Sequence, residues 1–247
     1  MTADAWIRRF VPAPDAPTRL VCLPHAGGAA SYFLGFAKAL SPGVDVIAVQ
    51  YPGRQDRRMD PFVETVPAMA DAVMVALRPW LDRPVTLFGH SMGATIGFEL
   101  AQRMEKAGAG PAALFASARR APSQRVDDAT YKLPDKALIA EVKRLGGAGS
   151  QLLDDPDIQE MVLPAIRNDY RAIETYTNTT EAKVACPIYA LVGDKDPKVT
   201  AAQAQAWSVH TTGKFDLHTY PGDHFYIDTN TPAILRQITA HLAEIRP

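Results

Sequence analysis

Short apolar runs rich in β-branched residues alternate with longer segments of helical periodicity along almost the whole chain. Such alternation is typical of βαβ units, in which parallel strands pair and helices cover the sheet. The runs are nearly continuously apolar, so both faces of the sheet are expected to be buried. The predicted strands are residues 20–23, 44–49, 85–88, 113–116, 188–192 and 217–220. We therefore predict an α/β fold with a mainly parallel central sheet and helices on both faces.

Helical periodicity fills the intervals between these strands. Thr200 and Gln203 have the spacing of a capping box, and Thr231-Pro232 has the form of an N-cap followed by a first-turn proline. We expect a helix to begin directly after each signal. The predicted helices are residues 32–40, 66–81, 94–106, 201–210 and 233–245.

Residues from about 121 to about 183 break this rhythm, because no run among them has strand character. Residues 136–145 and 158–176 have helical patterns instead, separated by Gly146-Gly147-Ala148-Gly149. This crossover is much longer than the usual connection. We predict a helical lid insertion at approximately 121–183 within a single domain spanning 1–247. The alternative is two further helices packed on the sheet.

Composition and charge limit the possible partners and cofactors. The net charge of −1 and the scattered basic residues argue against nucleic acid. Cys22 and Cys186 lie in or beside apolar strand-like runs, so we expect two buried thiols and no disulfide framework. No His, Asp or Glu grouping has metal-ligand spacing, so neither a metal nor a cofactor is expected. The first ten residues lack a signal-peptide core and no apolar run is long enough to span a bilayer, which predicts a cytoplasmic protein without membrane contact.

Gly89-His90-Ser91-Met92-Gly93 joins a predicted strand to a predicted helix. A Gly-x-Ser-x-Gly match alone is weakly specific, but its position at a strand-to-helix turn is that of a nucleophile elbow. The turn would expose the Ser91 hydroxyl beside the helix N-terminus, whose amides can stabilise negative charge. The pattern predicts an α/β-hydrolase fold with Ser91 as the nucleophile.

A serine nucleophile needs a base, and the base needs an acid that orients it. In this fold the order along the chain is serine, acid, histidine. Asp196 and His224 each follow a predicted strand, and we assign them as acid and base. Asp194 is the alternative acid. Asp223 could tune the base, although a solvated loop aspartate is the simpler interpretation.

The other histidines are expected to have no catalytic role. His210, His218 and His241 fall within predicted elements and are expected at the surface. His90 is expected to pack beside the nucleophile turn.

Acyl transfer also requires donors for a negatively charged oxygen. The amide of Met92, directly after the nucleophile, is one predicted donor. The second is expected in the glycine-rich loop after the first core strand, and we assign the Ala26 amide. The alternative is a glycine-rich turn without a catalytic part.

Six segments together resemble the type II thioesterases that accompany polyketide synthases and non-ribosomal peptide synthetases. The likeness runs from about residue 20 to the C-terminus. The segments are Pro24-His25-Ala26-Gly27-Gly28, Tyr51-Pro52-Gly53-Arg54-Gln55-Asp56-Arg57, Gly89-His90-Ser91-Met92-Gly93, Arg119-Arg120-Ala121-Pro122, Gly193-Asp194-Lys195-Asp196-Pro197 and Pro221-Gly222-Asp223-His224-Phe225. Many family members have Gly-Gly-His-Phe-Phe around the base and a glycine where this chain has Ala118.

The resemblance implies a stand-alone editing hydrolase that removes stalled acyl or aminoacyl groups from the phosphopantetheine arm of acyl or peptidyl carrier proteins. It also implies an acyl-enzyme on Ser91 and a mobile lid over the acyl pocket. The start of the chain close to the fold favours the stand-alone form, and we expect a monomer. Arg54, Arg57, Arg119 and Arg120 lie in loops expected near the site and could meet the arm's phosphate or an acidic carrier; local salt bridges are the alternative.

Three other functions remain open. A carboxylesterase or lipase acting on small-molecule esters would use the same triad. An acyltransferase or cyclising release enzyme would replace water with an amine or hydroxyl. A hydrolase-fold protein that only binds is the remote alternative, because such proteins typically lose a triad member and none is lost here.

Overall fold

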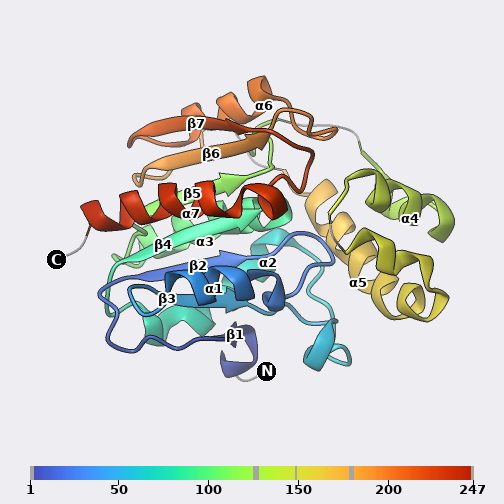
Figure 1. The fold of residues 1–247 in the computed structure, drawn as a ribbon, viewed down its shortest axis with the longest axis horizontal. Coiled ribbons are helices and arrows are strands. Elements are labelled where there is room, and N and C mark those ends of the chain that lie inside the picture. The colour runs from blue at the N-terminus through green and yellow to red at the C-terminus, as the bar shows by residue number, and fades with distance from the viewer. Residues whose placement is uncertain (1–2, 125–127, 148, 178–180, 246–247) are drawn as a thin grey trace.

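The computed structural model describes residues 3–124, 128–147, 149–177 and 181–245. Its centre is a seven-stranded sheet in the order β1-β3-β2-β4-β5-β6-β7 (Figure 1). The strands are β1 (Ile7–Arg8), β2 (Arg19–Leu23), β3 (Asp45–Val49), β4 (Val85–His90), β5 (Ala113–Ser117), β6 (Ile188–Gly193) and β7 (Phe215–Tyr220). Every neighbouring pair is parallel except β1 with β3. The predicted α/β fold is confirmed; β1 was not predicted, because two residues carry no periodicity.

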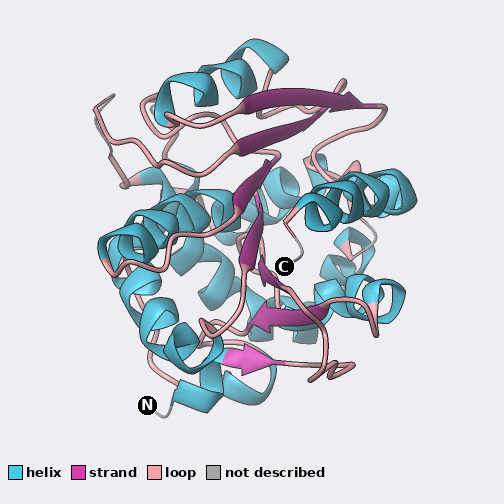
Figure 2. Cartoon of the chain, turned by 90° about the vertical axis from the view of Figure 1, so that its left-hand side faces the viewer, coloured by secondary structure: helices cyan, strands magenta, loops and turns pink. Residues whose placement is uncertain are grey.

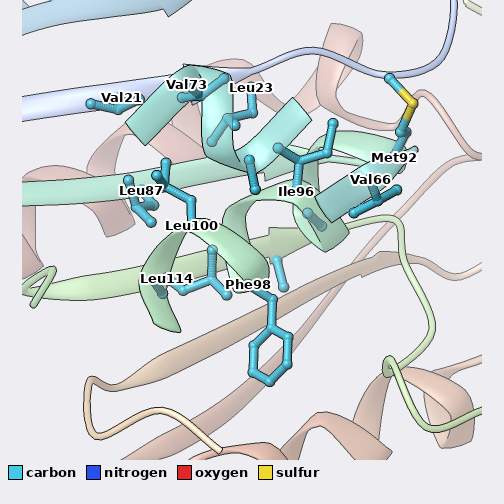
Figure 3. Close-up of a cluster of buried hydrophobic side chains, with 14 of the residues drawn as sticks. Val21, Leu23, Val66, Val73, Leu87, Met92, Ile96, Phe98, Leu100 and Leu114 are labelled. Carbon is cyan, nitrogen blue, oxygen red and sulfur yellow. The ribbon is translucent and has the colours of Figure 1, made fainter. Parts of the chain in front are cut away.

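Helices cover both faces of the twisted sheet (Figure 2). Alternate residues of each strand point to opposite faces, so Val21 and Leu23 join one buried cluster while Leu20 and Cys22 join the other. Figure 3 shows part of the first cluster, in which strand residues meet helix residues such as Ile96. The covering helices are α2 (Val66–Leu77), α3 (Met92–Lys106) and α6 (Ala201–Gln205) on the first side, and α1 (Leu34–Leu40) and α7 (Ile227–Glu244) on the second.

The two predicted helix starts have different outcomes. Thr200 accepts a hydrogen bond from the Gln203 amide and the reciprocal bond is also present, which confirms the capping box. The prediction that the last helix follows Thr231-Pro232 is wrong, because α7 begins at Ile227 and contains Pro232. The turn that carries His224, after β7, leads into this helix before Thr231 is reached, and the Thr231 hydroxyl donates to the Ile227 carbonyl at 2.7 Å instead of capping.

The connection from β5 to β6 carries the predicted helical insertion. Its helical elements are a 3₁₀ turn (Thr130–Lys132), α4 (Asp135–Arg144), a second 3₁₀ turn (Ser150–Asp154) and α5 (Pro156–Glu174). Figure 1 shows α4 and α5 beside the sheet rather than on either face. They share a small apolar cluster of their own, formed by Leu138, Ile139, Leu153, Leu163 and Ile166. We call residues 121–183 the lid insertion; residues 125–127, 148 and 178–180 of it lie outside the described residues, and its opening and closing stay a prediction.

Within the described part of the chain, no helix is both long enough and apolar enough to span a bilayer.

Candidate active site

The Ser91 turn is held in a strained backbone between β4 and α3. Ser91 has φ 53° and ψ −117°, and its amide donates to the Ser117 carbonyl at 2.8 Å. A Cβ on Gly93 would lie 2.0 Å from the Leu23 carbonyl oxygen, and one on Gly89 would lie 2.2 Å from the Gly93 oxygen. Only glycine fits at either position, so the motif's glycines are required by backbone packing.

Ser91, His224 and Asp196 meet as the sequence predicts. His224 Nε2 lies 2.9 Å from Ser91 Oγ, and His224 Nδ1 lies 2.9 Å from Asp196 Oδ2. A carboxylate can only accept, so Nδ1 carries the proton and Nε2 is free to accept the serine proton. His224 is 4% exposed and the Asp196 side chain is fully buried, which protects the pair from water.

The loop contacts distinguish the three aspartates. Asp196 Oδ1 accepts from the amides of Lys198 and Val199 at 2.8 and 3.2 Å, which fixes its carboxylate toward His224. Asp194 instead accepts from the Gly222 amide at 2.8 Å and ties the two loops together. Asp223 is an exposed loop residue that accepts from the Phe225 amide, in agreement with the simpler interpretation.

The glycine-rich loop after β2 lies beside the nucleophile because Leu23 pairs with Gly89 across the sheet. In this loop the Gly28 amide donates to the His25 carbonyl at 2.9 Å, and the Gly27 amide donates to Asp169 Oδ2 at 2.8 Å. The amides of Ala26 and Met92 have no acceptor among the described residues. Both residues line a small cavity together with Ser91. These two amides can therefore receive a negatively charged oxygen.

Two cavities meet at Ser91 and His224. The larger, of about 330 Å³, runs under the lid insertion, where Val142, Leu153, Val162 and Ile166 supply apolar walls. The smaller, of about 40 Å³, is lined by apolar residues together with charged ones, Arg119, Arg120, Asp128, Glu174 and Lys198. The larger cavity can thus hold an apolar chain beside the nucleophile, and charged side chains lie near the reacting atom.

His25 is a site residue that the sequence analysis missed. Its ring lines the apolar cavity beside Phe225. Burial, and after it electrostatic repulsion from the neighbouring His224 and Arg54, lowers the pKa of His25 to about 3. A neutral imidazole therefore faces the substrate space at neutral pH. Its place directly after a strand, in a glycine-rich loop, was the available signal.

His90 is buried as expected and belongs to a polar chain behind the nucleophile. Its Nδ1 lies 2.9 Å from Ser117 Oγ, which lies 2.6 Å from the Tyr226 hydroxyl. Burial is the main cause that lowers the pKa of His90 well below its usual value, because the charged form would lose its hydration. His90 therefore has a packing role beside the nucleophile turn and does not act as a second base.

The expectation of surface positions is wrong for His210 and His241. Both are buried, at 0% and 6% exposure. His210 bonds to the Ser123 hydroxyl and the Ala182 carbonyl, each at 2.8 Å, so its polar atoms are satisfied without water. His241 lies against the ring of Tyr189 on the inner side of α7. His218, on edge strand β7, is half-buried.

Three of the four loop arginines make ion pairs within the chain. Arg57 pairs with Asp60 and Arg120 with Asp128, so local pairing describes these two. Arg54 instead pairs with Asp169 on α5, far away along the chain. Arg119 donates from Nε to Thr95 Oγ1 at 3.1 Å, and the residue also lines the smaller cavity beside Ser91. Burial and the neighbouring Arg120 lower the Arg119 pKa to about 9.

Comparison with known proteins agrees with this geometry. Residues 18–242 match the thioesterase domain family. The chain belongs to the thioesterase family. It is 46% identical over 243 residues to thioesterase PikA5 of Streptomyces venezuelae, covering 98% of this chain and 86% of that protein. The structure of the type II thioesterase BorB from the borrelidin biosynthetic cluster superposes with a TM-score of 0.91 at 50% identity, covering 98% and 99% of the two chains. RedJ, a thioesterase of the prodiginine pathway in Streptomyces coelicolor, has a TM-score of 0.86 at 35% identity, covering 92% and 86%.

The two departures from the family pattern have visible consequences in this thioesterase. Ala118 has φ 51°, a left-handed conformation that glycine adopts more easily, so the chain accepts local strain there. Tyr226, in place of the second phenylalanine, supplies the hydroxyl that contacts Ser117. Neither change removes a group of the Ser91, His224 and Asp196 arrangement.

Proposed function

We propose that this thioesterase hydrolyses acyl or aminoacyl thioesters carried on the phosphopantetheine arm of acyl or peptidyl carrier proteins, and so clears stalled synthases. The observation that carries the proposal is the apolar cavity of about 330 Å³ under the lid insertion, which is lined by Ser91 and His224. A carrier-bound thioester has an acyl chain attached to its carbonyl, and this cavity offers that chain an apolar space beside the nucleophile. The similarity to PikA5 and BorB supports it.

In the acylation step, Ser91 Oγ attacks the thioester carbonyl as His224 Nε2 takes the hydroxyl proton. The carbonyl oxygen becomes negatively charged and is received by the Ala26 and Met92 amides. The carbon–sulfur bond then breaks, and the arm leaves as a thiol with the proton from His224. Asp196 stabilises the imidazolium that exists between these events.

In the deacylation step, water replaces the thiol. His224 removes a proton from the water as its oxygen attacks the ester carbonyl on Ser91, and the proton returns to Ser91 Oγ as the acid departs. Both steps use only side chains and amides of this chain, so we propose that no bound cofactor takes part. The monomeric state and the cytoplasmic location stay predictions.

The decisive experiment compares an acyl group on a carrier protein with the same group in a small oxygen ester. We expect a clear preference in kcat/KM for the carrier thioester and free acid as the product. Preference for the oxygen ester would instead indicate a carboxylesterase. Product joined to an added amine or hydroxyl would indicate an acyltransferase.

A further inference from the structure

Asp169 connects the lid insertion to the loop beside the nucleophile. Its side chain is fully buried on α5, although a charged residue is rarely buried without a partner. Asp169 Oδ2 accepts the Gly27 amide at 2.8 Å and also pairs with the guanidinium of Arg54. One carboxylate of the insertion therefore binds two groups of the core.

The contact fixes the backbone next to the predicted oxyanion donor. Gly27 has φ +74°, and a Cβ built on it would lie 2.6 Å from Cγ1 of Ile166, so α5 sits directly on the loop backbone. The Gly27 amide nitrogen belongs to the peptide bond that joins Ala26 to Gly27. The Gly27 and Gly28 amides are both occupied, whereas the Ala26 amide has no acceptor among the described residues, and Ala26 lines the cavity at Ser91.

Arg54 braces this arrangement from the other side. It donates to the Pro52 carbonyl at 2.9 Å, and its guanidinium lies 5.2 Å from the ring centre of Tyr51. The Tyr51 hydroxyl in turn donates to the Pro24 carbonyl at 3.4 Å, at the start of the same loop. The buried ion pair thus holds the loop at two places: Asp169 binds Gly27, and Arg54 supports Pro24 through the ring of Tyr51. Removing either charge would leave the other buried charge without compensation.

We infer that Asp169 is a positioning residue for the proposed thioester hydrolysis: its carboxylate holds the peptide between Ala26 and Gly27 so that the Ala26 amide faces the developing oxyanion. The catalytic loop is then formed only while α5 is docked. Movement of the lid insertion must therefore leave this part of α5 in place. The inference rests on the proposed function for the identity of the substrate, whereas the contacts of Asp169 are independent of that function.

The test is Asp169→Asn, which keeps the shape of the side chain but removes the charge that the buried Arg54 guanidinium needs. A neutral amide is also a weaker acceptor for the Gly27 N–H, so the loop should lose its fixed position. We expect kcat and kcat/KM to fall together, by about 10- to 100-fold, because the lost interaction acts on the transition state. The fall should be the same for an acetyl and an octanoyl group on one carrier. A raised KM with unchanged kcat, or a loss confined to octanoyl, would show that Asp169 only shapes the acyl cavity.

A second readout does not depend on the thioester. A small fluorophosphonate modifies Ser91 through a phosphoryl oxygen that the same amides would stabilise, so its inactivation rate should fall by a similar factor. Wild-type protein that reacts with the fluorophosphonate but not with acyl carriers would refute the proposed function alone. Equal inactivation rates in wild type and Asp169→Asn would refute the role of Asp169.

Two further variants separate positioning from folding. Asp135→Asn breaks an ion pair between α4 and Arg167, which lies two residues from Asp169 on α5 but pairs away from the catalytic loop, and should leave all rates unchanged. If Asp169→Asn does not fold, the double variant Asp169→Leu with Arg54→Met removes both charges, which buried sites often tolerate. It also removes the acceptor of the Gly27 amide, so it should show the same equal loss in kcat and kcat/KM.

Discussion

His224 Nε2 lies 2.9 Å from Ser91 Oγ although 133 residues separate the two along the chain. The parallel sheet explains this proximity, because the loops after β4 and β7 leave the same edge. The Asp196 loop, after β6, leaves that edge as well. Each of the three groups is thus positioned by a strand end, and the lid insertion closes over them from the side.

The Ser91→Ala variant should lose turnover of an acyl carrier by at least about 1,000-fold, because Ser91 carries the hydroxyl that lies in contact with His224 Nε2. The substitution is small and the turn's glycines remain, so the melting temperature should change little. Release of free acid, followed by chromatography, provides the measurement. Turnover close to wild type would refute the assignment of the nucleophile.

The Asp196→Asn variant should lower kcat by roughly 1,000- to 10,000-fold, because an amide no longer stabilises the imidazolium of His224. Asp194→Asn is the matched control. Asp194 contacts the Gly222 amide and not the histidine, and the new side chain retains an acceptor oxygen. A similar loss in both variants would mean that the loop as a whole, rather than the Asp196 carboxylate, matters.

The Gly93→Ala variant should destabilise the fold by more than about 4 kcal/mol or prevent folding, because the new methyl group would overlap the Leu23 carbonyl. Gly35→Ala is the opposite case. Gly35 is exposed on α1 with no atom near its Cβ position, so alanine should stabilise by about 0.5–1 kcal/mol through helix propensity. Urea unfolding of both variants measures the difference; similar stabilities would contradict it.

Much of the fold could be predicted from the sequence because strand and helix periodicities are local. The Ser91, Asp196 and His224 positions were also accessible, since each follows a strand whose position the sequence indicates. Asp169 was not, because its partner Gly27 is 142 residues away. Its one local signal is a charge within the apolar positions of α5, between Ile166 and Ile173.

Other errors have the same origin. The start of α7 depends on how the chain leaves β7, which outweighed the local capping pattern at Thr231. A place within a predicted element suggests the surface for His210 and His241, but which side of an element is buried depends on distant residues such as Ser123 and Tyr189. Tertiary contacts decide these cases, and a single sequence does not display them.

The Val162→Phe variant should shift acyl preference toward shorter chains. Val162 lines the apolar cavity, and the phenyl ring of the larger side chain would fill part of that space. We expect kcat/KM for octanoyl carrier to fall by about 10-fold or more, with acetyl carrier nearly unchanged. Met161→Phe is the control, since Met161 is 54% exposed on the same helix. An equal effect on both acyl groups would place the acyl chain elsewhere.

The stability of the protein should decline as the pH falls below about 6.5, in part because of His90. Burial lowers the pKa of His90 well below 6.5 in the folded chain, so the unfolded chain binds a proton that the folded chain does not. One such group changes the free energy of unfolding by up to about 1.4 kcal/mol per pH unit. The stabilisation is fully present only above the pKa of the histidine in the unfolded chain. Urea unfolding between about pH 8 and pH 5 should therefore give a shallower slope for His90→Gln than for wild type. Parallel slopes would contradict a neutral, buried His90, whereas a uniform offset alone would report only the lost bond to Ser117.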